Sequence, residues 1–213
     1  MNKELRQRFL SSLILITIVA IIVIEGGVFF NLFLVLCFFL TIFEWHNMSK
    51  KFIYHIPGIF FIILSYFSIY YLTNKLNDNY SYFLFILLTC ISTDLGGYIV
   101  GKIIKGPKLS KISPKKTYSG TLGSFLFAII FAYFYLENSI YVSLEILIFV
   151  ISISAVSQIG DLIISYFKRI SRIKDTGKLI PGHGGILDRI DGMIFAFPFS
   201  LIILITYNID FFK

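Results

Sequence analysis

The residues best suited to chemistry form a dense stretch near the C-terminal end of the chain. It reads Lys174-Asp175-x-Gly177-x-x-x-Pro181-Gly182-His183-Gly184-Gly185-x-x-Asp188-Arg189-x-Asp191. Its glycines and proline predict an irregular backbone that can approach a ligand closely. Asp188 and Asp191 would share one face if a helix has begun there. Paired carboxylates beside lysine and arginine suit a divalent cation that bridges phosphate groups, while the basic residues neutralise the remaining charge.

A second basic stretch, Ser113-Pro114-Lys115-Lys116-Thr117-Tyr118-Ser119-Gly120, lies just before an apolar run that begins near residue 121. Lysines, hydroxyl groups and the free N–H groups of a helix start are the parts from which phosphate sites are made. A basic loop that merely sets membrane topology has a similar composition. The residues alone leave these two interpretations open.

Two aspartates, Asp94 and Asp161, lie inside apolar runs. A charged residue in a spanning helix is costly and usually faces a bundle interior or an aqueous cavity. On a helix, a polar stripe within an arc of about 80° would contain Ser154, Ser157, Asp161, Ser165 and Lys168. The alternative is hydrogen bonding between helices with a snorkelling Lys168. Near Asp94, the spacing of Gly97 and Gly101 favours close helix packing.

The composition predicts the setting of these residues. Hydrophobic residues make up 57% of the 213 positions and charged residues only 15%, whereas soluble globular chains contain about 25% charged residues. We therefore expect an all-α, polytopic transmembrane bundle with one domain over residues 1–213. The net charge of +7 points to anionic lipid heads or phosphorylated substrates, and not to nucleic acid, because no soluble module could carry a nucleic-acid-binding face.

Hydropathy predicts about seven spans, at residues 9–24, 28–43, 57–72, 80–101, 121–136, 142–167 and 193–207. The first two are near the lower limit of about 17 residues, so a tilted hairpin or a re-entrant pair is the alternative there. Lys and Arg accumulate in cytoplasmic loops. With the N-terminus inside, the alternate loops hold 17 of the 19 basic residues. We therefore expect a cytoplasmic N-terminus, with both chemically promising stretches on the cytoplasmic face.

With these two basic stretches, the chain closely resembles the phosphatidate cytidylyltransferases, also called CDP-diacylglycerol synthases. The C-terminal signature of that family is complete in Ser165, Lys168-Arg169, Lys174-Asp175, Gly177, Pro181 to Gly185, Asp188-Arg189 and Asp191. Gly160-Asp161 and the Ser-Pro-Lys-Lys-Thr segment also fit, so the resemblance covers residues 94–192. Tyr118-Ser119 and Gly192 depart from residues frequent in the family, which affects substrate fit and rate more than reaction type.

The resemblance implies that CTP and phosphatidic acid react to give CDP-diacylglycerol and pyrophosphate, with Mg²⁺ required. The implied catalytic residues are Asp161, Lys168, Asp188 and Asp191, of which the three aspartates would bind the metal. The implied substrate-binding residues are Ser113, Lys115, Lys116, Thr117, Arg169, His183 and Arg189. For His183 we favour a role as a ligand and as a hydrogen-bond donor that organises its loop over a role as general base, because a phosphate-monoester nucleophile is already ionised. A monovalent cation, membrane lipids and a homodimer are further candidate partners, and the expected location is the bacterial inner (plasma) membrane.

Three rival functions remain at this point. A CTP-dependent lipid kinase of the polyprenol or dolichol type would transfer the γ-phosphate instead. A CDP-alcohol phosphotransferase would need a second aspartate pair downstream of Asp191, where Met193 to Phe197 is apolar. An ion transporter would use Asp94 and Asp161 along its path, but the loops expected on the outer face carry few acidic residues.

Overall fold

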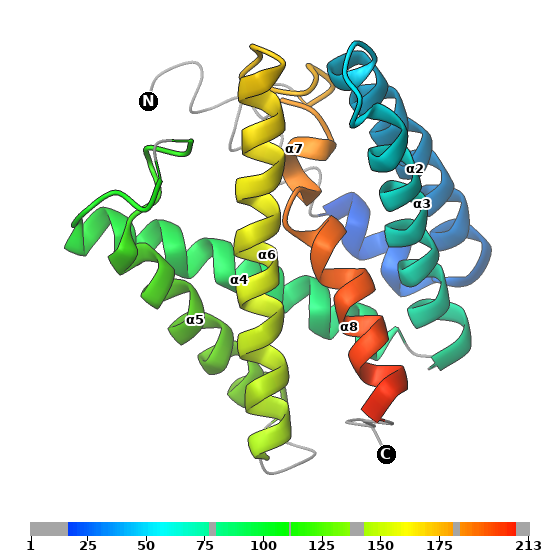
Figure 1. The fold of residues 1–213 in the computed structure, drawn as a ribbon. Helices are drawn as coiled ribbons and strands as arrows, with labels where there is room; N and C mark the ends of the chain where they lie inside the picture. The colour runs from blue at the N-terminus through cyan, green and yellow to red at the C-terminus, as the bar shows by residue number, and fades with distance from the viewer. Residues whose placement is uncertain (1–16, 77–79, 111, 137–142, 181–183, 208–213) are drawn as a thin grey trace. The chain divides into compact units, whose positions relative to one another are not determined.

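The computed structural model describes residues 17–76, 80–110, 112–136, 143–180 and 184–207, and most of these residues are helical. A first helix covers residues 17–25 of the described chain. The later helices are α2 (Gly27–Ser49), α3 (His55–Tyr71), the π-helix η1 (Leu72–Leu76), α4 (Ser81–Ile104), α5 (Tyr118–Leu136), α6 (Leu144–Ile170), α7 (Leu187–Ile190) and α8 (Met193–Tyr207) (Figure 1).

Within the described residues, five helices are long and apolar enough to cross a membrane: α2, α3 with its continuation to Asn74, α4, α5 and α6. The apolar helix α8 is shorter, with 15 residues. This agrees with the predicted all-α, polytopic membrane protein. The cytoplasmic N-terminus stays a prediction, and residues 9–16 of the first predicted span lie outside the described residues.

The second predicted span differs most from the structure. The apolar run ends at residue 43, but α2 continues to Ser49 and contains 23 residues. The helix can continue through Glu44 because the carboxylate of Glu44 accepts hydrogen bonds from another segment of the chain. A re-entrant pair, which the short apolar run allowed, is not needed for a helix of this length.

The chain forms two compact units, which we describe separately. The first comprises Met1–Tyr70 and Phe167–Ile190, and the second comprises Tyr71–Tyr166 and Asp191–Lys213. Helix α6 contributes its last turn to the first unit and the rest of its length to the second. The expectation of one membrane domain over residues 1–213 stays a prediction.

In the first unit, α2 and α3 lie side by side (Figure 1). The hydroxyl groups of Thr41 and Tyr66 are 2.8 Å apart, and the indole N–H of Trp45 donates to the carbonyl of His55 at 3.0 Å. The Tyr54 hydroxyl also meets that of Ser171, just beyond α6, at 3.0 Å. The loop that carries Lys50 and Lys51 therefore lies at the same end of this unit as the stretch after α6, as the loop charges predicted.

In the second unit, α4 and α5 cross closely because glycines line their contact. A methyl group at Gly123 would collide with Val100 and would lie 2.8 Å from the carbonyl oxygen of Gly96. A methyl group at Gly97 would lie 2.6 Å from Oγ of Ser124. The predicted packing role of the small residues on α4 is thus confirmed. Helix α8 joins this unit by stacking Phe197 on Phe83, with ring centroids 5.5 Å apart.

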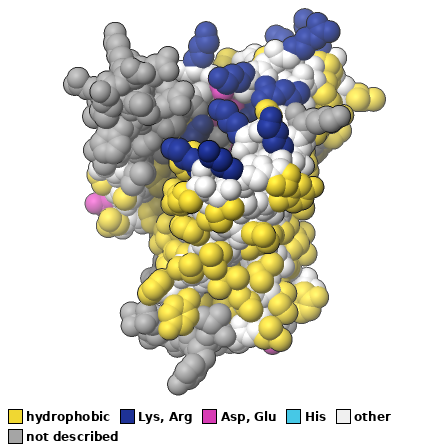
Figure 2. Space-filling model, turned by 90° about the vertical axis from the view of Figure 1, so that its left-hand side faces the viewer, with side chains coloured by type: hydrophobic (Ala, Val, Ile, Leu, Met, Phe, Trp, Pro, Cys, Tyr) yellow, Lys and Arg dark blue, Asp and Glu magenta, His cyan; other side chains and the backbone are white. Residues whose placement is uncertain are grey.

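Many large apolar side chains remain exposed on the helices, including Phe29, Leu32 and Phe39 of α2. Figure 2 shows one face, on which hydrophobic side chains cover an extensive area. Such exposure is costly in water and is expected where helices face lipid tails. The chain is therefore a multi-pass integral membrane protein.

Candidate functional site

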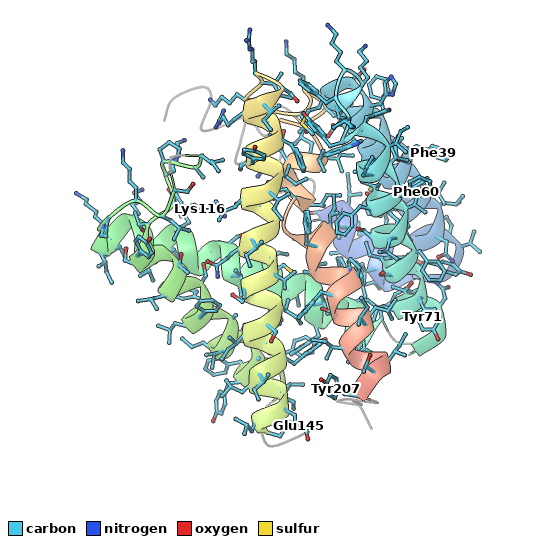
Figure 3. The ribbon with its side chains drawn as sticks, viewed as in Figure 1. Phe39, Phe60, Tyr71, Lys116, Glu145 and Tyr207 are labelled. Carbon is cyan, nitrogen blue, oxygen red and sulfur yellow. The ribbon has the colours of Figure 1, made fainter. Side chains whose placement is uncertain are left out.

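In the second unit, one basic and two acidic side chains meet beside α6. Lys116 Nζ lies 2.6 Å from Asp161 Oδ2 and 3.4 Å from the carbonyl oxygen of Gln158. Figure 3 shows the labelled Lys116 beside α6. The Asp191 carboxyl lies beside the carboxyl of Asp161, and Ser165 donates to Asp161 Oδ1 at 3.2 Å. We call Lys116, Asp161 and Asp191 the second-unit cluster.

The turn before α5 positions Lys116. The backbone N–H of Lys116 donates to the carbonyl of Ser113 at 3.1 Å, and the carbonyl of Lys116 accepts the backbone N–H of Leu109 at 2.8 Å. Thr117 Oγ1 then accepts the N–H of Gly120 at 3.1 Å, which is the hydrogen bond that a helix N-cap makes. Thr117 was predicted to bind substrate, and the structure adds a capping role at the start of α5.

In the first unit, Lys168 Nζ donates to Asp188 Oδ1 at 2.8 Å. The other oxygen, Asp188 Oδ2, accepts the backbone N–H groups of Thr176 at 2.8 Å and Gly185 at 3.0 Å. We call this pair and its two amide donors the first-unit cluster. Lys168 is only 8% exposed, so it does not snorkel, because its ammonium group already has a buried carboxylate partner.

Two opposing effects act on the pKa of Asp188. Burial raises it, but hydrogen bonds from Lys168, Gly185 and Thr176, together with the positive charge of Lys168, outweigh burial and hold the pKa below its ordinary value. Asp188 is therefore ionised at neutral pH. Gly184 allows the chain to turn here with φ of 89°, and a methyl group on it would lie 2.6 Å from Asp188 Oδ2.

Sequence reasoning missed Glu44, an acidic residue of α2 that is only 2% exposed. Its carboxylate accepts from Thr176 Oγ1 at 3.0 Å, from the N–H of Ile186 at 3.0 Å and from the N–H of Leu187 at 2.8 Å. The signal in the sequence is a carboxylate at the end of an apolar run. Such a residue needs a partner, but nothing in its spacing indicates which segment supplies one.

The other predicted residues that the structure describes contribute no side chain to the ion pair of either cluster. Lys115, Arg169 and Arg189 have exposed side chains, and Ser113 is half-buried. Asp94 is also exposed in α4. The prediction for His183 lies outside the described residues.

The second-unit cluster fits a divalent cation. Asp161 and Asp191 bring two carboxyl groups together, and positive charge close to them stabilises the ionised form of both. No group of three or more His, Cys, Asp or Glu side chains gathers in the described part of the chain. Mg²⁺ suits such a place, because it is commonly held by one or two carboxylates while water and substrate phosphates supply its other ligands.

Comparison with known proteins agrees with this chemistry. Residues 51–207 match the family described as the cytidylyltransferase family. Phosphatidate cytidylyltransferase of Rickettsia typhi is 34% identical over 201 residues, which cover 90% of this chain and 88% of that protein. The enzyme of the same name in Rickettsia bellii is 36% identical, over 92% of this chain and 89% of that protein. The Staphylococcus saprophyticus enzyme is 40% identical over 63% of this chain and 53% of its own length.

Proposed function

We propose that this chain, which belongs to the cytidylyltransferase family, transfers the cytidylyl group of CTP to phosphatidic acid. The products would be CDP-diacylglycerol and pyrophosphate, and the role would be phospholipid biosynthesis. The observation that carries the proposal is the second-unit cluster, in which two carboxylates and a lysine meet at a helix of a membrane protein. This combination suits a cation and a nucleotide phosphate at the same place.

In the proposed reaction, a phosphate oxygen of phosphatidic acid attacks the α-phosphorus of CTP in line. A bond from that oxygen to the α-phosphorus forms, and the bond from the α-phosphorus to the oxygen bridging it to the β-phosphorus breaks, so pyrophosphate leaves. The nucleophile is already ionised, so no base is needed. The contribution of the protein is alignment and charge neutralisation.

We assign Mg²⁺ to Asp161 and Asp191, with Asp188 as a third candidate ligand. When bound, the cation would neutralise charge on the nucleotide phosphates. Lys116 can hold a phosphate oxygen, and the exposed side chains of Lys115, Arg169 and Arg189 are candidates for the rest of the triphosphate and for the lipid phosphate. Lys168 would act on the lipid phosphate or on the leaving pyrophosphate, and a monovalent second cation remains part of the proposal.

The setting follows from the substrates. CTP would arrive from the cytosol, while the acyl chains of phosphatidic acid would stay in the bilayer between apolar helices. The bacterial relatives support a location in a bacterial inner membrane. Association with membrane lipids and a homodimer are further proposals for the same setting.

The deciding experiment supplies purified protein with phosphatidic acid and CTP labelled at either the α- or the γ-phosphate. Cytidylyl transfer puts the α-label into the lipid and releases the γ-label as pyrophosphate. A lipid kinase would put the γ-label into a lipid alcohol instead. A CDP-alcohol phosphotransferase would consume CDP-diacylglycerol and release CMP. Lipid that gains no α-label, in the presence of Mg²⁺, would overturn the proposal.

A further inference from the structure

Glu44 binds a segment of the chain more than 130 residues away in sequence. Both of its carboxylate oxygens accept a backbone N–H: Oε1 from Ile186 and Oε2 from Leu187. Oε2 also accepts the hydroxyl of Thr176. These three donors lie at the two ends of the segment 176–187, which contains the glycine-rich part of the family signature. One buried carboxylate therefore joins both ends of that segment to α2.

The segment lies so close to this carboxylate that side chains are excluded at two positions. A methyl group at Gly177 would lie 2.6 Å from Oε1 of Glu44, and a methyl group at Gly185 would collide with both oxygens. Glycines at these positions are thus required by the contact with Glu44. A ligand elsewhere on the segment is not needed to explain them.

A carboxylate is specifically suited to this position. Within the described residues the ion pairs are Lys116–Asp161 and Lys168–Asp188, and neither includes Glu44. Its carboxyl oxygens are therefore satisfied by the two amide N–H groups and the hydroxyl group. A glutamine could present only one acceptor oxygen, and its NH₂ group would face an N–H donor.

The same segment is also held by Asp188, which accepts the N–H groups of Thr176 and Gly185. Thr176 joins the two carboxylates, because its hydroxyl donates to Glu44 while its backbone N–H donates to Asp188. The next residue of α2, Trp45, packs edge-on against Phe167, with ring centroids 5.5 Å apart. Glu44 therefore contacts Leu187, the neighbour of Asp188 in the sequence. Trp45 contacts Phe167, the neighbour of Lys168.

We propose that Glu44 is a positioning residue, which holds segment 176–187 so that Lys168, Asp188 and Arg189 meet the substrate phosphates in the correct arrangement. Glu44 acts through these residues and touches no substrate itself. The catalytic part of this inference rests on the proposed cytidylyl transfer. The structural part does not, because it concerns only how the segment is held.

Hydrogen exchange followed by mass spectrometry tests the structural part on the full-length protein in detergent. Glu44→Gln should increase exchange in peptides that contain Ile186 and Leu187. Thr41→Val is the matched control, because Thr41 is also a buried polar residue of α2 but bonds to Cys37 and Tyr66 instead of the segment. It should leave exchange in 176–187 as in the wild type.

Steady-state kinetics tests the catalytic part, with activity expressed per folded protein. We expect Glu44→Gln to lower kcat about tenfold or more, with a change of less than about threefold in KM for CTP. Glu44→Asp, which keeps the charge, should restore part of the loss. Thr41→Val should stay within about twofold of the wild-type kcat. If α2 contributed only to the overall structure, Thr41→Val and Glu44→Gln would lower kcat alike.

A milder pair keeps the test decisive if Glu44→Gln does not fold. Thr176→Val removes one of the three donors and should lower kcat by about threefold to tenfold, while Thr176→Ser keeps the hydroxyl and should stay near wild type. Wild-type exchange of the segment in both Glu44→Gln and Thr176→Val would overturn the inference, as would increased exchange with unchanged kcat. If exchange increases but the wild type transfers no cytidylyl group, the proposed function fails and the structural part stands.

Discussion

Asp188 forms an ion pair with Lys168 across 2.8 Å and accepts two backbone N–H groups on its other oxygen. The carboxylate therefore joins the end of α6 to the segment that returns to α7. Its side chain is only 4% exposed. A residue expected from the sequence to bind a metal is thus also a structural anchor.

Asp188→Asn should abolish turnover and should also loosen the segment that Asp188 holds. An amide cannot accept on both sides, so one donor loses its partner, at a cost of about 1–3 kcal/mol for each unsatisfied buried group. The measurement is activity with phosphatidic acid and CTP, alongside the unfolding temperature in detergent. Near-normal turnover with unchanged Mg²⁺ dependence would contradict a role for Asp188 at the cation.

The stability difference between wild type and Asp188→Asn should depend on pH. Because the pKa of Asp188 is lowered in the folded protein, its stabilising contribution is complete above the unfolded pKa of about 3.9. The contribution is lost as the pH falls through the folded pKa. We expect a constant difference in unfolding temperature above about pH 5 and a shrinking difference below about pH 4. A difference that grows on acidification would contradict the lowered pKa.

Lys116→Ala should weaken the use of CTP more than Lys115→Ala does, although both remove one positive charge. Lys116 contacts Asp161 at 2.6 Å, whereas the side chain of Lys115 is exposed. Removing Lys116 takes a cation from beside the paired carboxyls as well as from the substrate. We expect kcat/KM for CTP to fall about tenfold or more for Lys116→Ala and about threefold for Lys115→Ala.

CTP saturation curves measured at several Mg²⁺ concentrations check this difference. Lys116→Arg, which keeps the charge, should be less damaging than Lys116→Ala. If both alanine variants had wild-type saturation curves, the basic stretch before α5 would revert to a signal of membrane topology.

The residues of the second-unit cluster could be predicted from the sequence, but the contacts of Glu44 in the first unit could not. Asp161 was found because a carboxylate inside an apolar run is costly, and Lys116 because two lysines lie among hydroxyl groups. Glu44 was missed because its partners lie 132 to 143 residues away, and such a contact leaves no periodic pattern. The same cause placed the end of the second span at residue 43, because hydropathy alone does not show that a buried charge is satisfied.

Gly96→Ala should destabilise the crossing of α4 and α5. A methyl group at Gly96 would collide with the carbonyl of Gly123 and would lie 2.6 Å from Cβ of Phe127. Overpacking of this kind costs about 1–3 kcal/mol. Gly101→Ala is the graded comparison, because its nearest neighbour would be Oγ1 of Thr117 at 3.0 Å. Unfolding temperatures in detergent should fall more for Gly96→Ala, and equal values would contradict the packing described for this crossing.

The sidedness of the loops tests the predicted topology together with the proposed reaction. The stretches 102–116 and 168–189 must both face the compartment that contains CTP, since both carry proposed substrate-binding residues. In a background without Cys37 and Cys90, single cysteines at Ser110 and Lys178 should react with an impermeant thiol reagent only from the cytoplasmic side. A cysteine at Asn138, which lies outside the described residues, should react only from the other side.

Lysed membranes are the control, in which all three cysteines should react with the reagent. This control distinguishes a cysteine on the far side of the membrane from a cysteine whose side chain is buried in the protein. Labelling of positions 110 and 178 from opposite sides would mean that the chain between them crosses the membrane an odd number of times. Helices α5 and α6 would then not both span it. Lys116 and Asp188 could not act on the same CTP molecule, and the proposed reaction would lose one of its two sets of phosphate-binding residues.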